Sequence, residues 1–415
     1  MASPKPPIQV FEHQTLHFGR DGELSVFKEK HFNALVKLNE LHDNQYFTVV
    51  HKGIKFKQFV GVIQVDDLTL EILPKIDNAP GSKNDWQRVL IEMLRITKKL
   101  DVHDVGEAHI TKQNIHLLDI YFDWFLREVK LLVHQGLIKK YYRETSNVRA
   151  LKGKLEFAGH IRQNIIHKER FFTTHQIYDK DHLIHRVLAK ALDVVASVSK
   201  GGNLNSRCKI VQLDFPEVAE IDVNVSTFEK IVLDRKSRPY ETALKIARLI
   251  ILNYAPNVSS GRENMIALLF DMNLLWEEYV LARLKQVAGD HKVYRQQSKV
   301  FWKNITIRPD IVIIKSEKKL IIDTKWKALK DGKPSTDDLR QMYVYNDYWK
   351  SSKAMLLYPS TISKRVIFNS YNAISSTSVH HKCGIGEISI FKSGTTTLDA
   401  DFGTTLLSWL DEPSH

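Results

Sequence analysis

Two aspartates and a lysine interrupt an otherwise apolar segment late in the chain. The segment holds two runs of Ile, Leu and Val on either side of the polar tetrad 315–318, a pattern typical of an antiparallel hairpin. Folding about the middle of the tetrad predicts that Asp310 lies opposite Asp323 on one face, with β-carbons about 5 Å apart. Because side chains alternate along a strand, Lys325 shares that face and Thr324 points away from it.

These residues predict metal-dependent hydrolysis of phosphate esters. Acids within an apolar strand are costly to bury without partners, and a divalent cation would supply them. Hard oxygen ligands favour Mg²⁺, for which Mn²⁺ can substitute, and Mg²⁺ accepts a phosphate oxygen in its coordination shell. We expect Asp310 and Asp323 to hold the ion with the backbone carbonyl of Thr324. Lys325 then orients the attacking water or stabilises the charge of the transition state. A surface salt bridge is the alternative interpretation.

A third carboxylate is predicted from helical periodicity upstream of the hairpin. Apolar residues recur at helical spacing over 264–287, and at about 100° per residue Glu277 falls on the apolar stripe. Its neighbour Glu278 falls on the polar side of the same helix. We therefore expect Glu277 to point inward and to belong to the metal site, and Glu278 to face solvent.

The elements that position these residues indicate a mixed α/β architecture, here of the α+β kind. In the C-terminal range 256–415, helices are expected at 264–287 and 336–351, and strands at 293–301, 306–315, 319–326 and 354–358. Upstream, strands expected at 46–51, 56–65 and 68–73 favour a small β-rich N-terminal module. A mainly helical middle region follows, with helices expected at 86–100, 115–137, 181–198 and 242–254 and a loop at 201–206. The predicted domains are thus 1–82, 83–255 and 256–415.

The composition favours a folded protein with a polyanionic partner. The 415 residues include 60 Lys and Arg against 48 Asp and Glu, with a pI of about 9.3. Nine of these cations but only three acids fall between His134 and His175, a stretch that either follows a phosphate backbone or forms a solvated face. No segment reaches the roughly 18 apolar residues of a membrane helix. Two widely separated cysteines fit a reducing cytoplasm.

Two histidine clusters are weaker candidates for a metal site. His380, His381 and Cys383 lack a second ligand pair at metal-binding spacing, which favours a loop. His182 and His185 stand three apart on a predicted helix and could share a ligand, but satisfaction by hydrogen bonds is the better interpretation.

At its catalytic motif the sequence resembles the PD-(D/E)XK nuclease superfamily, through Pro309 and Asp310 followed by residues 323–325. It resembles still more closely the McrC family, the nuclease subunits of McrBC modification-dependent restriction systems. Further segments that resemble this family, in the same order, are 70–76, 151–155, 271–277 and 338–345. In the last of them Gln341 and Tyr345 share one helical face. The resemblance implies that Gln341 is an accessory active-site residue.

The resemblance also implies a nuclease domain of PD-(D/E)XK type over 256–415 and a division of labour with a motor. McrC-like subunits cleave DNA and, through the N-terminal module, bind and stimulate a hexameric McrB-like AAA+ GTPase that recognises modified double-stranded DNA. The lack of a G-x-x-x-x-G-K-[ST] motif agrees with a nucleotide site on the partner. Two alternatives stay open. One is a stand-alone nuclease of DNA repair or recombination, and the other is a non-catalytic DNA-binding adaptor of a motor ATPase.

Overall fold

The computed structural model describes residues 7–19, 26–65, 68–76, 79, 81–99, 116–199, 202–256, 264–327, 329, 332–372 and 381–411. The turn predicted at 66–67, most of the predicted break at 255–261 and His380 of the histidine cluster lie outside these residues. Contacts group the chain into two compact units, one over 118–268 and one joining 5–117 to 269–415. The three-domain division of the sequence stays a prediction.

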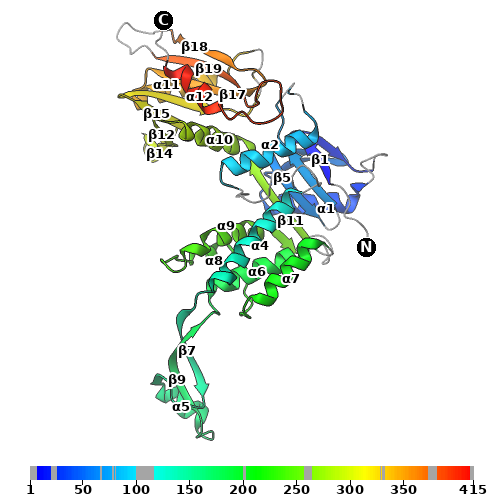
Figure 1. The fold of residues 1–415 in the computed structure, drawn as a ribbon, viewed down its shortest axis with the longest axis vertical. Helices are drawn as coiled ribbons and strands as arrows, with labels where there is room; N and C mark the ends of the chain where they lie inside the picture. The colour runs from blue at the N-terminus through cyan, green and yellow to red at the C-terminus, as the bar shows by residue number, and fades with distance from the viewer. Residues whose placement is uncertain are drawn as a thin grey trace. The chain divides into compact units, whose positions relative to one another are not determined.

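The N-terminal part of the second unit is built from two small sheets. Strand β6 (Leu68–Leu73) pairs in parallel with β1 (Ile8–Phe11) and antiparallel with β5 (Phe59–Val65). In the other sheet, β4 (Gly53–Phe56) lies between β2 (Thr15–His17) and β3 (Phe47–Val50). Helices α1 (Glu29–Leu41) and α2 (Lys83–Ile96) complete this part (Figure 1). The β-rich character predicted for this stretch is therefore confirmed, although the sequence reasoning did not anticipate β1, β2 or α1.

The C-terminal part of the second unit is a six-stranded mixed sheet with the strand order β12-β15-β16-β17-β19-β18. Its strands are β12 (Lys292–Arg295), β15 (Ile311–Lys315), β16 (Lys318–Thr324), β17 (Lys353–Ser360), β18 (Lys364–Ser370) and β19 (Lys382–Ser389). The central pairs β16–β17 and β17–β19 are parallel, and the other pairs are antiparallel. The crossover between β16 and β17 contains α11 (Thr336–Trp349), as a parallel pair requires.

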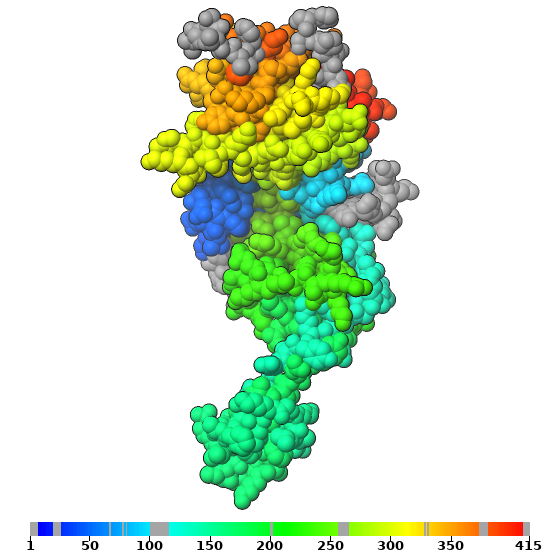
Figure 2. All heavy atoms as spheres, turned by 90° about the vertical axis from the view of Figure 1, so that its left-hand side faces the viewer, coloured from blue at the N-terminus to red at the C-terminus, as the bar shows by residue number. Residues whose placement is uncertain are grey.

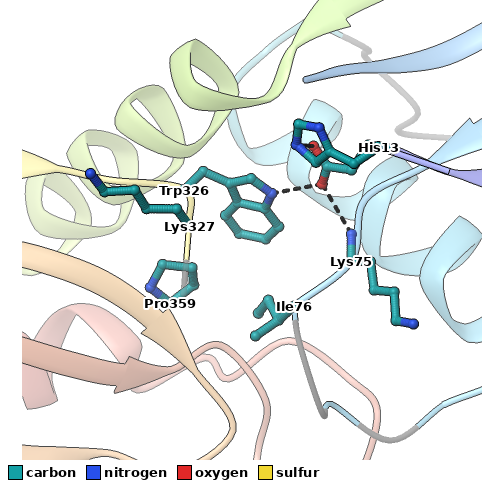
Figure 3. Close-up of a pocket in the computed structure, with 7 residues that line it drawn as sticks. His13, Lys75, Ile76, Trp326, Lys327 and Pro359 are labelled. Atoms are coloured by element: carbon teal, nitrogen blue, oxygen red, sulfur yellow. Dashed lines mark hydrogen bonds and ion pairs between the residues drawn. The ribbon is translucent and has the colours of Figure 1, made fainter. Parts of the chain in front are cut away.

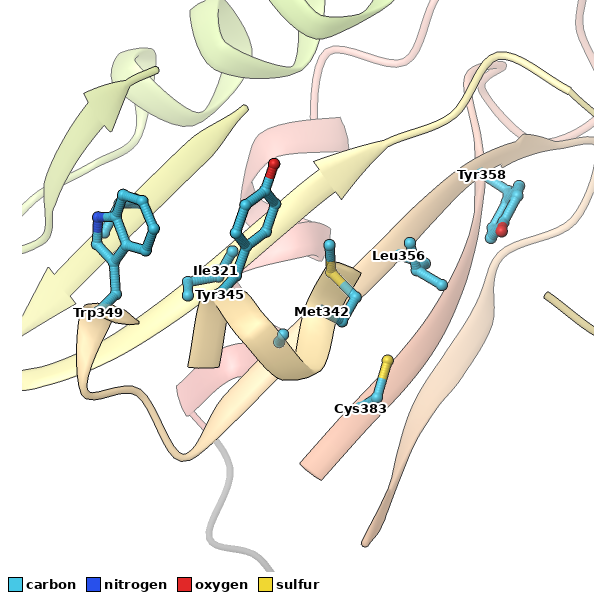
Figure 4. Packing of buried hydrophobic residues seen from close by; sticks show 9 residues of the cluster. Ile321, Met342, Tyr345, Trp349, Leu356, Tyr358 and Cys383 are labelled. Atoms are coloured by element: carbon cyan, nitrogen blue, oxygen red, sulfur yellow. The ribbon is translucent and has the colours of Figure 1, made fainter. Parts of the chain in front are cut away.

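Helix α11 packs its apolar side against this sheet. Figure 4 shows Met342, Tyr345 and Trp349 of the helix beside Ile321 of β16 and Leu356 of β17. All five side chains are buried, the most exposed of them being 5% accessible. This core fixes the position of the helix face that also carries Gln341. Helices α10 (Met272–Gln286) and α12 (Phe402–Asp411) contact each other and the same sheet.

The first unit consists of helices with a projecting arm. The helices are α4 (Leu117–Gln135), α6 (Leu183–Val198), α7 (Asn203–Asp214), α8 (Val225–Glu229) and α9 (Glu241–Leu252). The arm contains β7 (Lys140–Val148), β8 (Lys154–Leu155), α5 (Phe157–Asn164) and β9 (Phe171–Asp179), and it extends away from the helices of its own unit (Figures 1 and 2). Most of the basic stretch between His134 and His175 therefore lies in strands and a short helix. These elements were not predicted within the mainly helical middle region.

Four predicted elements differ from the structure. The strands expected at 293–301 and 306–315 are each divided in two, at 296–298 and at 308–310. The loop expected at 201–206 is mostly the start of α7, because Gly202 caps a helix that buries Cys208 and Val211. The helix expected at 264–287 begins only at Met272, since Asn264–Asp271 forms strand β11. Asp271 ends that strand and caps the helix, accepting hydrogen bonds from the backbone N–H groups of residues 273 and 274 at 2.8 and 3.3 Å.

Candidate active site

The hairpin that carries the two aspartates folds in the predicted register. Strand β15 pairs antiparallel with β16, and Ile311 lies opposite Ile322. Ser316 and Glu317 form the turn, both with positive φ, at 45° and 68°. One step beyond the last pair, the same register brings Asp310 beside Asp323.

Asp310 is held at the end of the hairpin by Thr324. Its Oδ2 accepts a hydrogen bond from the Thr324 backbone N–H at 2.7 Å and from the Thr324 hydroxyl at 2.8 Å. The expectation that the Thr324 side chain turns away from the acids is therefore wrong, because the threonine clamps one carboxylate with two donors. On the other side, the backbone N–H of Gln296 donates to the Asp310 carbonyl at 2.9 Å. The carboxylate is thus oriented before any ligand arrives.

Asp323 and Lys325 form a buried ion pair. Asp323 is 3% exposed, and the Lys325 ammonium lies 2.6 Å from its Oδ2. That oxygen nevertheless accepts no hydrogen bond of regular geometry among the described residues. Burial, together with the neighbouring Asp310 carboxylate, raises the pKa of Asp323. Burial opposes the charge on Lys325, but the carboxylates of Asp323, Asp338 and Asp310 together outweigh burial and raise the pKa of the ammonium above its usual value.

Two side chains of α11 complete the environment of Lys325. The lysine lies 3.4 Å from Asp338 Oδ1 and donates to Gln341 Oε1 at 3.4 Å. Gln341 in turn donates to the Tyr345 hydroxyl at 2.9 Å. Asp338 also pairs with Lys327 at 3.1 Å. In the sequence, Asp338 belongs to the segment 338–345 that resembles the McrC family, and no role was predicted for it, although its spacing of three from Gln341 places both on one helical face.

Glu277 points inward, as the helical periodicity predicts. It is 6% exposed, and Gln296 Nε2 donates to its two oxygens at 2.9 and 3.1 Å. Burial and the Asp310 carboxylate raise the pKa of Glu277, so the two acids share one electrostatic environment. Glu278 does not face open solvent, contrary to expectation, because Lys99 and Arg295 pair with it at 2.9 and 3.0 Å.

The candidate carboxylates can supply a divalent cation with two ligands but not with three. Among the residues that the structure describes, no group of three or more His, Cys, Asp or Glu side chains is close enough to hold a metal ion. Mg²⁺ commonly needs only one or two carboxylates from the protein and keeps several waters. The pair Asp310 and Asp323 meets that need, since a buried Asp323 oxygen lacks a regular donor and Asp310 raises the pKa of its neighbours. The two aspartates together fit Mg²⁺. The Glu277 carboxylate instead accepts hydrogen bonds from Gln296.

A pocket of about 160 Å³ lies beside the residues that follow β16, Trp326 and Lys327. Figure 3 shows its lining residues, with the Trp326 indole directed toward the carboxylate next to His13. That carboxylate belongs to Glu12, which is 6% exposed and accepts hydrogen bonds from Trp326 Nε1 at 2.7 Å and from the Lys75 backbone N–H at 3.1 Å. Because Trp326 follows Lys325 in the chain, the N-terminal segment after β1 fixes the residue next to the candidate lysine.

Trp326→Phe is expected to destabilise the fold by about 2 kcal/mol, because it removes a buried hydrogen bond to a charged group. The free energy of unfolding in urea measures this effect. Trp302→Phe is the matched control, since Trp302 is 58% exposed and its indole should contribute little. Equal stability of the two variants would show that the Glu12 contact does not stabilise the protein.

The histidine candidates have ordinary structural environments. His185 is fully buried, with Nδ1 2.7 Å from the Lys180 carbonyl oxygen and Nε2 3.2 Å from the Tyr240 hydroxyl. Burial lowers its pKa to about 4, which keeps the ring neutral at neutral pH. His182 stacks on it with ring centroids 4.0 Å apart. The predicted satisfaction by hydrogen bonds is confirmed for His185, whereas His182 makes its hydrogen bond through Nε2, 3.2 Å from the Ile138 carbonyl oxygen, and its Nδ1 has no hydrogen-bond partner among the described residues.

The sequence was compared with known families and proteins. The family described as "McrBC 5-methylcytosine restriction system component" matches residues 54–359. The chain belongs to this McrBC family. The family predicted from the dispersed sequence motifs is thereby confirmed, and the McrBC match covers strands β5 and β6 as well as the candidate site.

Two relatives of this McrBC-family chain give further context. A protein of Escherichia coli strain K12 described as type IV methyl-directed restriction enzyme EcoKMcrBC is 20% identical over 244 residues, 55% of this chain and 70% of that protein. One chain in a structure of Thermococcus gammatolerans McrB AAA+ hexamers with bound McrC is also similar. The match covers 97% of this chain and 99% of the matched chain, with a TM-score of 0.70 and 20% identity. This likeness shows that the McrBC-family chain shares that fold. None of its described helices has the length and apolar character needed to cross a membrane.

Proposed function

We propose that this chain is the McrC-type nuclease subunit of an McrBC restriction system and cleaves DNA by Mg²⁺-dependent phosphodiester hydrolysis. The observation that carries the proposal is the cluster of Asp310, Asp323 and Lys325 at the end of one hairpin, with a buried carboxylate whose pKa is raised. The order of these residues on two paired strands, with Gln341 on the following helix, supports a nuclease domain of PD-(D/E)XK type. Such clusters are typical of functional sites rather than of ordinary surfaces.

Each residue of the cluster has a distinct proposed role. Asp310, Asp323 and the Thr324 carbonyl would hold Mg²⁺. Glu277, which does not form a group of three with the two aspartates, would add negative charge to the same electrostatic environment. When bound, the ion would supply positive charge to the scissile phosphate and lower the pKa of a water. Lys325 stabilises the negative charge that develops on the phosphate oxygens. Gln341 and Asp338 orient the Lys325 ammonium toward Asp323.

The proposed partner is an McrB-like AAA+ GTPase hexamer. The supporting evidence is the family and the likeness to a fold whose structure is described as McrB hexamers with bound McrC. Stimulation of that GTPase and the involvement of the 1–82 module in binding it belong to the same proposal. The substrate is then modified double-stranded DNA, delivered by the motor, and the compartment is the cytoplasm.

Plasmid cleavage by the purified chain tests this function. The expected result is cleavage of methylated plasmid only when Mg²⁺, GTP and an McrB-like hexamer are all present. Cleavage with Mg²⁺ alone would instead favour the stand-alone repair nuclease. Binding of DNA or stimulation of the GTPase without any cleavage would favour the non-catalytic adaptor. Replacing Mg²⁺ by Mn²⁺ should preserve activity, since both accept oxygen ligands.

A further inference from the structure

A small hairpin next to the candidate site exposes large apolar side chains. It consists of β13 (Lys299–Trp302) and β14 (Ile305–Ile307), which pair antiparallel. All four residues of β13 are exposed, and the exposed fractions of the large apolar side chains in the hairpin are 63% for Val300, 45% for Phe301, 58% for Trp302 and 55% for Ile305. A cluster of this kind on a two-stranded hairpin costs free energy in water and marks a surface that a partner covers.

The segment that contains the hairpin carries charges of a single sign. Residues 291–309 contain five Lys and Arg and no Asp or Glu: Lys292, Arg295, Lys299, Lys303 and Arg308. Arg295 is already paired with Glu277 and Glu278 outside this segment. Lys303 at the turn lies over the Trp302 ring, with the ammonium 4.7 Å from the ring centroid. The exposed aromatic surface is thus combined with cations. A second copy of the same surface would repel it, whereas a polyanion would be attracted.

The hairpin is held in a fixed position relative to the site. Phe301 packs on Tyr348 of α11 with ring centroids 5.5 Å apart, and the Lys299 ammonium donates to the Tyr348 carbonyl at 2.6 Å. At the other end, the Tyr345 hydroxyl donates to the Arg308 carbonyl at 2.8 Å. Both anchors lie on α11, which also carries Gln341. Strand β14 ends three residues before Asp310.

We propose that the β13–β14 hairpin contacts the DNA duplex beside the scissile phosphate. Lys303 and the neighbouring cations bind backbone phosphates, and Trp302 with Ile305 lies against the sugars and base edges of a groove. This inference rests on the proposed nuclease function and adds to it the surface that holds the substrate. The hairpin is separate from the residues assigned to the metal and to Lys325, so binding and cleavage can be measured independently.

Fluorescence anisotropy of a labelled duplex, with the full chain in EDTA to prevent cleavage, tests the hairpin. Lys303→Ala is expected to reduce the slope of log K against log salt by about 1, because one phosphate contact is lost. Trp302→Ala is expected to weaken binding about tenfold at constant salt, within the range measured for aromatic contacts to nucleic acid. Lys209→Ala and Leu213→Ala on α7 are the matched controls, since both side chains are exposed and lie outside the hairpin.

Parental affinity and parental salt slope in both hairpin variants would overturn the inference. So would a halved molar mass of Trp302→Ala in light scattering, which would make the hairpin a contact between copies of the chain. The Asp323→Asn variant separates the two proposals, because it should bind the duplex like the parent without cutting it. If Asp323→Asn cuts DNA at the parental rate, the proposed catalytic site fails, whatever the hairpin variants do.

Discussion

Asp323→Asn is expected to lower DNA cleavage by about a thousandfold, equivalent to about 4 kcal/mol of activation free energy. Asparagine keeps the size of the side chain but removes the charge proposed to hold Mg²⁺. The thermal stability of the variant should equal or exceed that of the parent, because the raised pKa of Asp323 shows that folding disfavours its ionised form. Cleavage of plasmid in the presence of the partner and a thermal melt measure the two effects.

Asp347→Asn is the matched control for this substitution. Asp347 lies on α11 with a side chain 65% exposed, away from the apolar core of the sheet, and its loss should leave cleavage unchanged. A folded Asp323→Asn protein that cuts at the parental rate would remove Asp323 from the site. The stabilisation of the protein by added Mg²⁺ gives an independent reading, because it should disappear in Asp323→Asn but persist in Asp347→Asn.

Lys325→Ala is expected to reduce cleavage by about a hundredfold or more, because it removes a charge directed at the developing negative charge of the transition state. It also removes the cation that stabilises the Asp323 carboxylate. The pKa of Asp323 should therefore rise further, so a higher pH is needed to ionise it. Part of the lost rate should consequently return as pH increases, and rate profiles against pH for the parent and the variant measure this shift.

Lys327→Ala provides the comparison for Lys325. Both lysines contact Asp338, but the Lys327 side chain is 52% exposed and that of Lys325 is 22% exposed. We expect Lys327→Ala to change cleavage only a few-fold at most, as is usual for an exposed ion pair. If both variants lose cleavage activity equally and their pH profiles are unshifted, Lys325 contributes only positive charge to the region and does not act at the reacting phosphate.

The hairpin and the inward direction of Glu277 could be predicted because local periodicity determines them. Two β-branched runs around a polar tetrad leave one register that buries the apolar faces, and that register pairs Ile311 with Ile322. Similarly, the helical spacing of the apolar residues indicates which of the two adjacent glutamates points inward, and Glu277 is the buried one. The start of that helix was placed too early, because the apolar run before Asp271 suits a buried strand equally well.

Contacts between distant segments could not be predicted in this way. Gln296 reaches both Glu277 and the backbone of Asp310 from a separate loop, with a positive φ of 43°. Asp338 reaches Lys325 across the β16–β17 crossover. Neither contact leaves a periodic signal in the sequence. One depends on how β12 pairs at the edge of the sheet, and the other on how α11 packs on it. The projecting arm of the first unit was missed for a different reason, because its β7 strand alternates between exposed and half-buried residues without a clear apolar face.

The hydrogen bond between Glu12 and Trp326 limits how this chain can be divided into fragments for study. Strand β1 adds to β6, and the glutamate that follows it reaches the residue beside Lys325. A fragment restricted to 256–415 would carry every residue proposed for catalysis. It would nevertheless leave the Trp326 indole without its hydrogen-bond acceptor, Glu12. It would also expose the surface around Trp326 that the N-terminal segment covers. Cleavage studies should therefore use a chain that retains both ends. Low cleavage activity of a truncated fragment would reflect the loss of the Glu12 contact more than the catalytic role of the aspartates.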